Sequence, residues 1–206
     1  SRGLGDVYKR QDEGSASRTI EVQVDKNAAL YYYPQPVIPF AQSAFDSKMT
    51  IHLEDETSKL FLLEIISCGR NAHEERFQYR RFSSKVLLYR GEKLIYRDNT
   101  RYEPGKMPME GIGLYEGFTH MANLFLSKLC DRGDADGLDR TSELKEKIWQ
   151  ILDEDSEVDG GVTRLTTGDL ALRIFGHRAQ KLQQIAEKIK EIYTSCQINH
   201  KSVMNE

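Results

Sequence analysis

Residues 30–77 read LYYYPQPVIPFAQSAFDSKMTIHLEDETSKLFLLEIISCGRNAHEERF, and this segment decides how the rest of the chain is interpreted. Two runs within it, Ala44–Leu53 and Leu60–Ser67, are rich in β-branched, aromatic and other apolar residues, with charges set between them. Such runs are typical of strands that are buried on at least one face. Between the aromatic run Leu30–Tyr33 and the first of these strands lies the stretch PQPVIPF, at residues 34–40.

This stretch is predicted to cross between strands in an extended conformation. Its three prolines are Pro34, Pro36 and Pro39. Proline fixes φ and has no N–H to donate, so the stretch cannot form a central strand of a sheet. Because Val37, Ile38 and Phe40 are apolar, we expect the crossing to be buried.

The second predicted strand leads into Cys68-Gly69-Arg70, and the run AHEERF follows at residues 72–77. Glycine at this point predicts a tight turn or a close approach of two backbone segments. The run after it brings several ionisable side chains close together in the sequence. We therefore expect this turn to be the part of the chain richest in polar chemistry.

The motifs PQPVIPF and GRNAHEERF, at residues 34–40 and 69–77, resemble those of the UreD family of urease accessory proteins, also called UreH. That family has a P-x-P-x-I-P-F core and a downstream G-R-x-x-x-G-E-x-F element. The matching residues are Pro34, Pro36, Val37, Ile38, Pro39, Phe40, Glu64, Gly69, Arg70, Glu75 and Phe77. Glu74 stands where the family usually has a second glycine, so we expect the local turn to differ. The resemblance runs from about Arg18 to Tyr193, and it is specific because two separated motifs occur in the right order.

The resemblance implies a mainly β, stacked-sheet or β-helix-like fold with two helices toward the C-terminus. It implies a cytoplasmic maturation protein, not an enzyme, that binds apo-urease together with UreF and the GTP-hydrolysing UreG. Such a scaffold or chaperone would help to deliver nickel to the urease active site, passing the ion on instead of retaining it. The alternative is a β-structured protein-interaction module with no metal role.

Composition sets limits that agree with these expectations. At 206 residues the chain is long enough to bury a sizeable core, and 39% hydrophobic with 30% charged residues is typical of a soluble globular protein. A net charge of −3 gives no reason to expect nucleic acid, and no apolar run reaches the length of a membrane span. Three scattered cysteines do not make a disulfide framework or a zinc site.

Three regions of the chain are distinguished. Residues 6–11, DVYKRQ, read like a translated transposon end from library preparation, so residues 1–11 are interpreted as an artefact within a lead that extends to residue 17. Residues 18–195 form the UreD-like domain, and residues 196–206 are expected to be a flexible tail. Family members carry a further β-rich N-terminal part that nothing here matches, so the chain is interpreted as truncated, with an exposed sheet edge.

Other segments predict further β structure. Strict alternation in Thr19–Val24 indicates a half-buried strand, and a turn at 25–27 returns the chain into Ala28–Tyr33. More short strands are expected at 76–82, 85–89, 93–97, 162–165 and 169–175. Arg90-Gly91-Glu92 predicts a hairpin turn, and 99–113 a loop. Because the early strands follow one another without helices, we expect an antiparallel-rich architecture.

Two helices are predicted in the C-terminal third. One has Leu144, Ile148, Ile151 and Leu152 on a single face, and the other, at about 178–193, repeats apolar residues at helical spacing. Residues 118–130 fit either a helix or a strand. The acidic run at 131–139 lacks the glycine position and closing glutamate of a calcium loop, so a solvated loop is expected there.

No pattern of a nucleotide-binding or hydrolytic enzyme is complete. The chain has no phosphate-binding loop, so it is not expected to bind GTP, and Gly111-Ile112-Gly113 with Gly117 misses the dinucleotide spacing. Cys68 and His73 lie close enough in sequence to suggest a nucleophile and its base, but no third group to orient them is indicated. We therefore expect no catalytic residues.

Candidate nickel ligands remain around the Gly69 turn and the next hairpin. They are Glu64, His73, Glu75 and Asp98, with Asp46 as a further carboxylate. Carboxylate and imidazole groups bind divalent transition metals, and a transient route needs weak, open sites because a closed tetrahedral site would retain the ion. The alternative is that these carboxylates pair with the arginines at positions 70, 76, 80 and 81.

Overall fold

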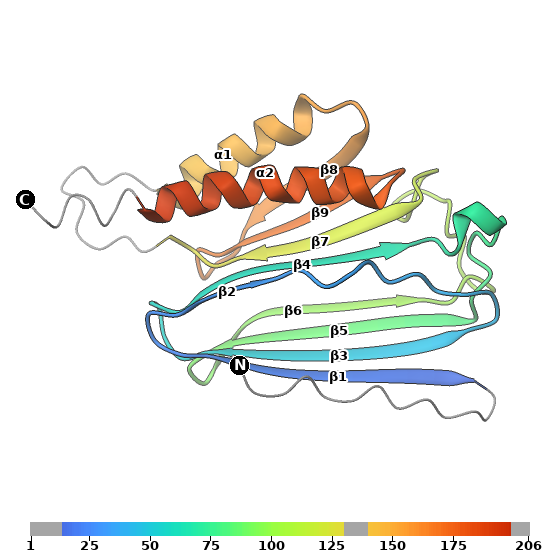
Figure 1. Ribbon diagram of the computed structural model, residues 1–206, viewed down its shortest axis with the longest axis horizontal. Coiled ribbons are helices and arrows are strands. Elements are labelled where there is room, and N and C mark those ends of the chain that lie inside the picture. The colour runs from blue at the N-terminus through green and yellow to red at the C-terminus, as the bar shows by residue number, and fades with distance from the viewer. Residues whose placement is uncertain (1–13, 130–139, 199–206) are drawn as a thin grey trace, which may run out of the picture. The chain divides into compact units, whose positions relative to one another are not determined.

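The structure, a computed structural model, describes residues 14–129 and 140–198 (Figure 1). These residues divide into two compact units. Unit 1 contains residues 14–29, 37–58 and 67–119, and unit 2 contains residues 30–36, 59–66, 120–129 and 140–198. The chain therefore enters each unit more than once.

Unit 1 is built on a four-stranded sheet in the order β1-β3-β5-β6. The strands are β1 (Ser15–Val24), β3 (Ala44–Leu53), β5 (Arg81–Arg90) and β6 (Lys93–Tyr102). β1, β3 and β5 run parallel, and β5 and β6 form an antiparallel hairpin. The hairpin turns at Gly91, which has a φ of 56° that glycine adopts easily, as the sequence predicted.

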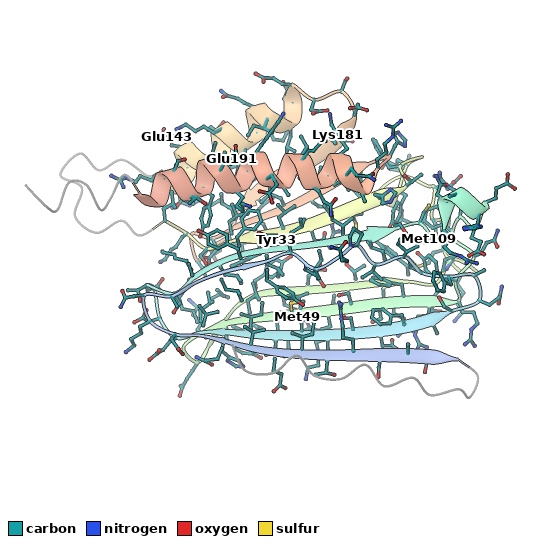
Figure 2. The ribbon with its side chains drawn as sticks, viewed as in Figure 1. Tyr33, Met49, Met109, Glu143, Lys181 and Glu191 are labelled. Carbon is teal, nitrogen blue, oxygen red and sulfur yellow. The ribbon has the colours of Figure 1, made fainter. Side chains whose placement is uncertain are left out.

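Alternation explains why these segments are strands. Along β3 the side chains of Met49, Ile51 and Leu53 are fully buried, and those between them are more exposed. Figure 2 shows Met49 among the strands of this sheet. Its register partner Val86 on β5 is also buried, so one row of apolar side chains runs across adjacent strands.

Unit 2 contains a five-stranded sheet in the order β2-β4-β7-β9-β8 and two helices. The strands are β2 (Ala29–Tyr32), β4 (Lys59–Ser67), β7 (His120–Leu126), β8 (Val158–Arg164) and β9 (Leu170–Gly176). The helices α1 (Arg140–Asp153) and α2 (Ala179–Ile198) lie over one face of this sheet (Figure 1). Residues 118–130, which fit either element by sequence, thus contain a strand.

The helices are held to the sheet by an apolar core. Ile148 of α1, Ile185 and Ile189 of α2 and Leu124 of β7 are at most 1% exposed within one cluster. Tyr193 on the last turns of α2 packs against Phe61 of β4, with ring centroids 6.2 Å apart. Burial of one face explains why helical spacing in the sequence located both helices.

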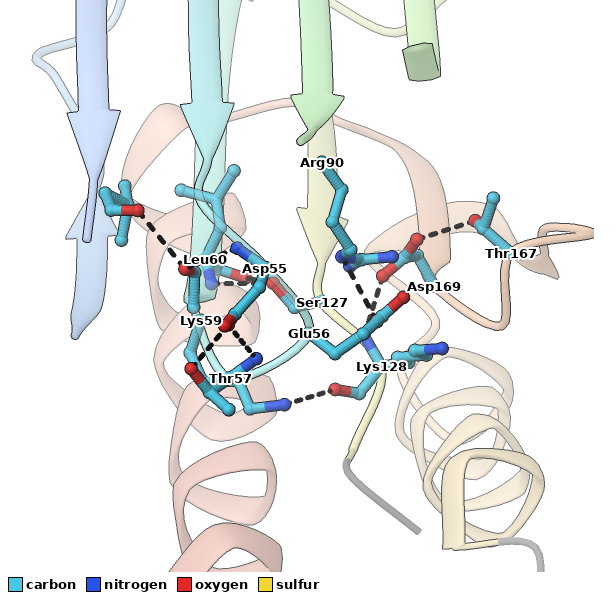
Figure 3. Close-up of polar contacts among 12 residues, drawn as sticks. Asp55, Glu56, Thr57, Lys59, Leu60, Arg90, Ser127, Lys128, Thr167 and Asp169 are labelled. Atoms are coloured by element: carbon cyan, nitrogen blue, oxygen red, sulfur yellow. Dashed lines mark hydrogen bonds and ion pairs between the residues drawn. The ribbon is translucent and has the colours of Figure 1, made fainter. Parts of the chain in front are cut away.

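Polar contacts hold the strand ends within each unit (Figure 3). In unit 1 the side chain of Arg90, 7% exposed, places its Nε 3.3 Å from Glu56 Oε2. In unit 2 the Nζ of Lys59 donates to the carbonyl of Lys128 at 2.9 Å, and the backbone N–H of Lys128 donates to Asp169.

The predicted class, mainly β with two helices toward the C-terminus, is confirmed. The prediction of antiparallel pairing is wrong for β1, β3 and β5. These strands alternate along the chain with β2 and β4, which belong to the other sheet, so the chain winds between two sheets as a β-helix-like fold requires. For the same reason the turn at Lys26 and Asn27 links two sheets and does not close a hairpin.

Several boundaries also differ from expectation. The strand predicted at 76–82 begins only at Arg81, because residues 71–80 form a short 3₁₀ helix and turns instead. The loop predicted from Asn99 begins after Tyr102, since β6 pairs with β5 to its end. The acidic run at 131–139 and residues 199–206 lie outside the described residues. Among the residues that are described, neither helix is long and apolar enough to cross a membrane.

Candidate functional site

The two sequence motifs meet within unit 1. The backbone N–H of Ser67 donates to the carbonyl of Val37 at 3.0 Å, which joins the proline stretch to the end of β4. We call residues 37–41 and 67–77 together the motif junction. The extended crossing makes one bridge at Val37 and otherwise no ladder, as its prolines predicted.

Gly69 allows the backbones of the junction to approach closely. Its φ is +139°, in a region that side chains rarely adopt. A Cβ atom at this position would lie 1.9 Å from the carbonyl oxygen of Glu75 and 3.5 Å from that of Pro39. The prediction of a close approach at Gly69 is therefore confirmed, and the residue touches both motifs.

Arg70 and Glu75 connect the motifs through side chains. The guanidinium of Arg70 pairs with the carboxylate of Glu75, with Nε 2.7 Å from Oε2, and its central carbon lies 4.7 Å from the centroid of the Phe40 ring. The same Oε2 accepts a hydrogen bond from the backbone N–H of Ala41 at 3.1 Å. The bonds from Arg70 and then Ala41 lower the pKa of Glu75, so this carboxylate is ionised at neutral pH.

The turn between the two partners is left-handed. Glu74 closes the short helix η1 (Asn71–His73) with φ 59° and ψ 20°, and its N–H donates to the carbonyl of Asn71. The family usually has glycine at this position, which adopts this conformation without steric cost. The turn therefore retains the conformation that suits glycine, although the residue is glutamate.

Arg76 extends the junction to the loop that follows β6. Its Nε lies 2.5 Å from Glu110 Oε1, and its Nη2 donates to the carbonyls of Gly117 and Phe118. The next residue, Phe77, packs edge-on against the fully buried Tyr115, with ring centroids 4.9 Å apart. The loop contribution was not predicted, because no residue type near Glu110 or Tyr115 indicates a contact some forty positions away.

Two apolar residues of the proline stretch are exposed. Ile38 is 51% and Phe40 57% exposed, so the expectation that the crossing is buried is wrong for these side chains. Pro39 between them is buried, so the backbone is fixed and its neighbours face outward. The junction thus presents an apolar pair on a rigid frame, the arrangement that protein-binding surfaces use.

The candidate nickel ligands occupy separate positions. His73 is exposed on η1, Glu75 pairs with Arg70, and Asp98 on β6 accepts a hydrogen bond from Thr100 Oγ1 at 2.9 Å. Asp46 pairs with Arg81, and Glu64 lies in β4 of unit 2. Within the described parts of the chain, no three histidine, cysteine or acidic residues form a group that could hold a metal ion. The arginine pairing weighed from the sequence is thus present for Glu75 and Asp46.

Cys68 has the properties of a structural cysteine. Its side chain is fully buried, and burial raises the pKa of the thiol above its usual range, which disfavours the nucleophilic thiolate. His73, the base considered for it, is exposed on the turn. The geometry gives this pair no evident nucleophilic role.

Comparison with known proteins identifies relatives. Residues 1–205 match the family model described as UreD urease accessory protein. The urease accessory protein UreH of Helicobacter pylori strain J99 is 32% identical over 194 residues, which cover 94% of this chain and 68% of that protein. The urease accessory protein UreD of Acetivibrio thermocellus is 31% identical over 185 residues (89% and 66%), and that of Haemophilus influenzae strain PittGG is 28% identical over 197 residues (92% and 69%).

Proposed function

The chain belongs to the UreD family of urease accessory proteins, and on that premise we propose that it is a scaffold for urease maturation. In this proposal it binds apo-urease together with UreF and UreG in the cytoplasm and helps nickel to reach the urease active site. Nickel is its cargo and not a resident cofactor, and UreG supplies the GTP hydrolysis. The chain itself performs no catalysis.

One observation supports a binding role most directly, which is the exposure of Ile38 and Phe40 on the motif junction. Gly69, Arg70 and Glu75 fix the backbone beneath this pair by close approach, cation–π contact and hydrogen bonding. A rigid frame reduces the entropy that binding must overcome, and exposed apolar side chains supply favourable burial. We therefore assign this surface to a partner of the maturation complex.

Nickel transfer is the second part of the proposal. Glu64, His73, Glu75 and Asp98 are the residues proposed for a transient route. Glu75 supports it because its lowered pKa keeps it ionised, as a metal ligand must be. The bonds of Glu75 to Arg70 and Ala41 instead favour the second candidate, a protein-interaction module with no metal role, because they give the carboxylate a structural task.

The binding role is tested by the double substitution Ile38→Ser and Phe40→Ser, expressed with urease, UreF and UreG. Because both side chains are exposed, unfolding stability should change by less than about 1 kcal/mol. Copurification with UreF or apo-urease should fall several-fold, and urease activation should fall with it. Leu94→Ser, which removes another exposed apolar side chain of unit 1, is the matched control and should leave both unchanged.

Two outcomes would contradict the assignment. Destabilisation of several kcal/mol by the double substitution would place these side chains in a core or a permanent interface. Undiminished copurification and activation by a folded double variant would show that the surface has no part in maturation.

A further inference from the structure

A basic groove lies beside the motif junction in unit 1. Three chain segments line it, at residues 42–44, 77–81 and 101–106, and its volume is about 720 Å³. The first two segments lead into β3 and β5, and the third follows from the end of β6. We call this feature the basic groove.

The groove concentrates positive charge on a chain that is acidic overall. Four cationic side chains and one carboxylate line it, which gives a formal charge of +3, whereas the whole chain carries −3. The cations are Arg80, Arg81, Arg101 and Lys106, and the carboxylate is Glu103. Charge segregated in this way attracts ligands of the opposite sign.

The cationic side chains are held in place. Arg81 donates from Nε and Nη2 to the carboxylate of Asp46, at 3.2 and 2.5 Å. These bonds use one edge of a guanidinium that has five N–H donors, so the arginine can contact a second carboxylate. A fixed guanidinium also loses less rotational freedom when a ligand binds.

Glu103 organises the opposite side of the groove. Arg101 donates from Nε to its Oε1 at 2.8 Å, and the Nζ of Lys106 lies 2.6 Å from its Oε2. Both cations remain largely accessible, with side chains 60% and 79% exposed. Glu103 therefore occupies the position toward which an external carboxylate would be drawn, and it is the internal competitor of such a ligand.

The shape and floor of the groove favour an extended ligand over a single ion. Phe77 and Ala44 contribute apolar surface, and the side chains of Gln42 and Gln78 contribute amide groups. A volume of about 720 Å³ lies within the range of roughly 300–1,000 Å³ typical of sites for drug-sized ligands. The cations come from β5, from β6 and from the loop after β6, so they are suited to several carboxylates spaced along one chain.

We propose that the basic groove binds an acidic peptide segment of a partner protein, with carboxylates at Arg81, Arg101 and Lys106. This goes beyond the scaffold role proposed above. It is tested on the isolated chain, so that its failure leaves that role standing.

The test measures fluorescence anisotropy of a short fluorescein-labelled peptide of alternating Glu and Gly, with alternating Gln and Gly as the uncharged control. The chain should bind the acidic peptide alone, and binding should weaken as salt is added. The double variant R101Q/K106Q should bind roughly tenfold more weakly, since two rim charges are lost. E103Q should bind more tightly, because the internal competitor has lost its charge.

The matched control is K93Q/R97Q, which removes the same charge from exposed positions of β6 outside the groove. An equal loss of affinity in this control would overturn the proposal, as would absence of peptide binding or unchanged affinity in E103Q. Displacement of the peptide by inorganic phosphate, at an ionic strength where sodium chloride does not displace it, would indicate a simple anion site instead. If R101Q/K106Q fails to fold, K106Q alone gives the same test, because Lys106 is the most exposed of the cations measured.

Discussion

At the scale of single residues, the motif junction depends on backbone conformations that most side chains disfavour. Gly69 has a φ of +139°, Glu74 a φ of 59° and Phe77 a φ of 54°, all within nine positions. Left-handed backbone at non-glycine residues costs free energy and persists only where surrounding contacts impose it. In this junction the contacts are those of Arg70 and Arg76, so the charges of the second motif stabilise its shape.

Replacing Gly69 with alanine should destabilise unit 1 by roughly 3–5 kcal/mol, because the new Cβ would meet backbone that cannot move aside as a side chain can. Urea unfolding would measure the change. Gly105→Ala is the control, since its Cβ would meet nothing within 4 Å. Equal stability of the two variants would show that the approach of residues 69 and 75 is not close in solution.

Replacing Glu74 with glycine should act in the opposite direction. Relief of the left-handed strain should stabilise the chain by up to about 1 kcal/mol, reduced by the greater freedom of glycine when unfolded. The readout is the urea midpoint at an unchanged slope. A clear loss of stability would mean that the glutamate side chain makes a contact worth more than the strain.

Glu103 should make stability depend on acid. Hydrogen bonds from Lys106 and Arg101 lower its pKa from 4.5 to about 2. The folded state thus binds this proton less readily than the unfolded state, so the contribution is complete above pH 4.5 and is lost as pH falls toward 2. Unfolding measured across this range should show a shallower fall for Glu103→Gln, and also for R101Q/K106Q. Parallel curves for all three proteins would refute the linkage.

The sequence predicted some of these residues and missed others for a definable reason. Gly69 was identified because glycine is informative about backbone conformation. Ile38 and Phe40 were misplaced because apolar character does not by itself determine burial, and much of any protein surface is apolar. Arg101, Glu103 and Lys106 gave no signal, since their significance arises only where separate chain segments meet.

At the scale of elements, alternation located most strands but not their neighbours. The period of two in β1 and β3 states which face is buried, and it is the same for parallel and antiparallel pairing. Parallel strands are usually joined by a crossover helix, and that expectation excluded parallel pairing for a helix-free region. In this fold β2 and β4 of the other sheet serve as the crossovers, which no local pattern reveals.

One consequence at this scale concerns β1, which forms an edge of its sheet over ten residues. Its inward-facing Ile20 and Val22 are only half-buried, although their register partners Met49 and Ile51 are fully buried. A long edge with accessible apolar side chains favours pairing with another chain. We therefore expect the isolated chain to self-associate or to need UreF for solubility.

Light scattering after size-exclusion chromatography would measure this association. Thr19→Lys places a charge on the edge and should reduce it, whereas Thr50→Lys adds the same charge to the inner strand β3 and should reduce it less. A monodisperse monomer that unfolds cooperatively would contradict the expectation.

At the scale of the whole molecule, the order of the chain differs from the order of its structure. Each unit is assembled from segments that alternate along the sequence, and the two motifs meet because the chain returns to unit 1 at both of them. The family resemblance located both motifs but indicated nothing about their contact, since a motif records residue types and spacing only. The contact among Phe40, Arg70 and Glu75 supplies a physical reason for their occurrence together.

The proposed nickel route is the question at this scale that substitutions can decide. Glu75→Ala removes the partner of Arg70 and Ala41, so it should cost stability whether or not nickel passes there. Asp98→Ala removes a partly exposed carboxylate of β6 and is the cleaner test. If Asp98 belongs to the route, its variant should keep its melting temperature and its copurification with UreF, while the nickel content and activity of urease fall several-fold. Glu92→Ala, at the exposed turn before the same strand, is the control and should activate urease fully.

The pattern of losses then separates the two roles. Parallel loss of stability, UreF binding and activation in the Asp98 variant would assign the carboxylate to structure, because a residue needed only for transfer leaves assembly intact. Full activation by the Glu75/Asp98 double variant would end the proposal for both residues. A loss confined to activation in Asp98→Ala, with the larger but mixed loss in Glu75→Ala, is the result that a transient route predicts, since weak open sites contribute to transfer and not to folding.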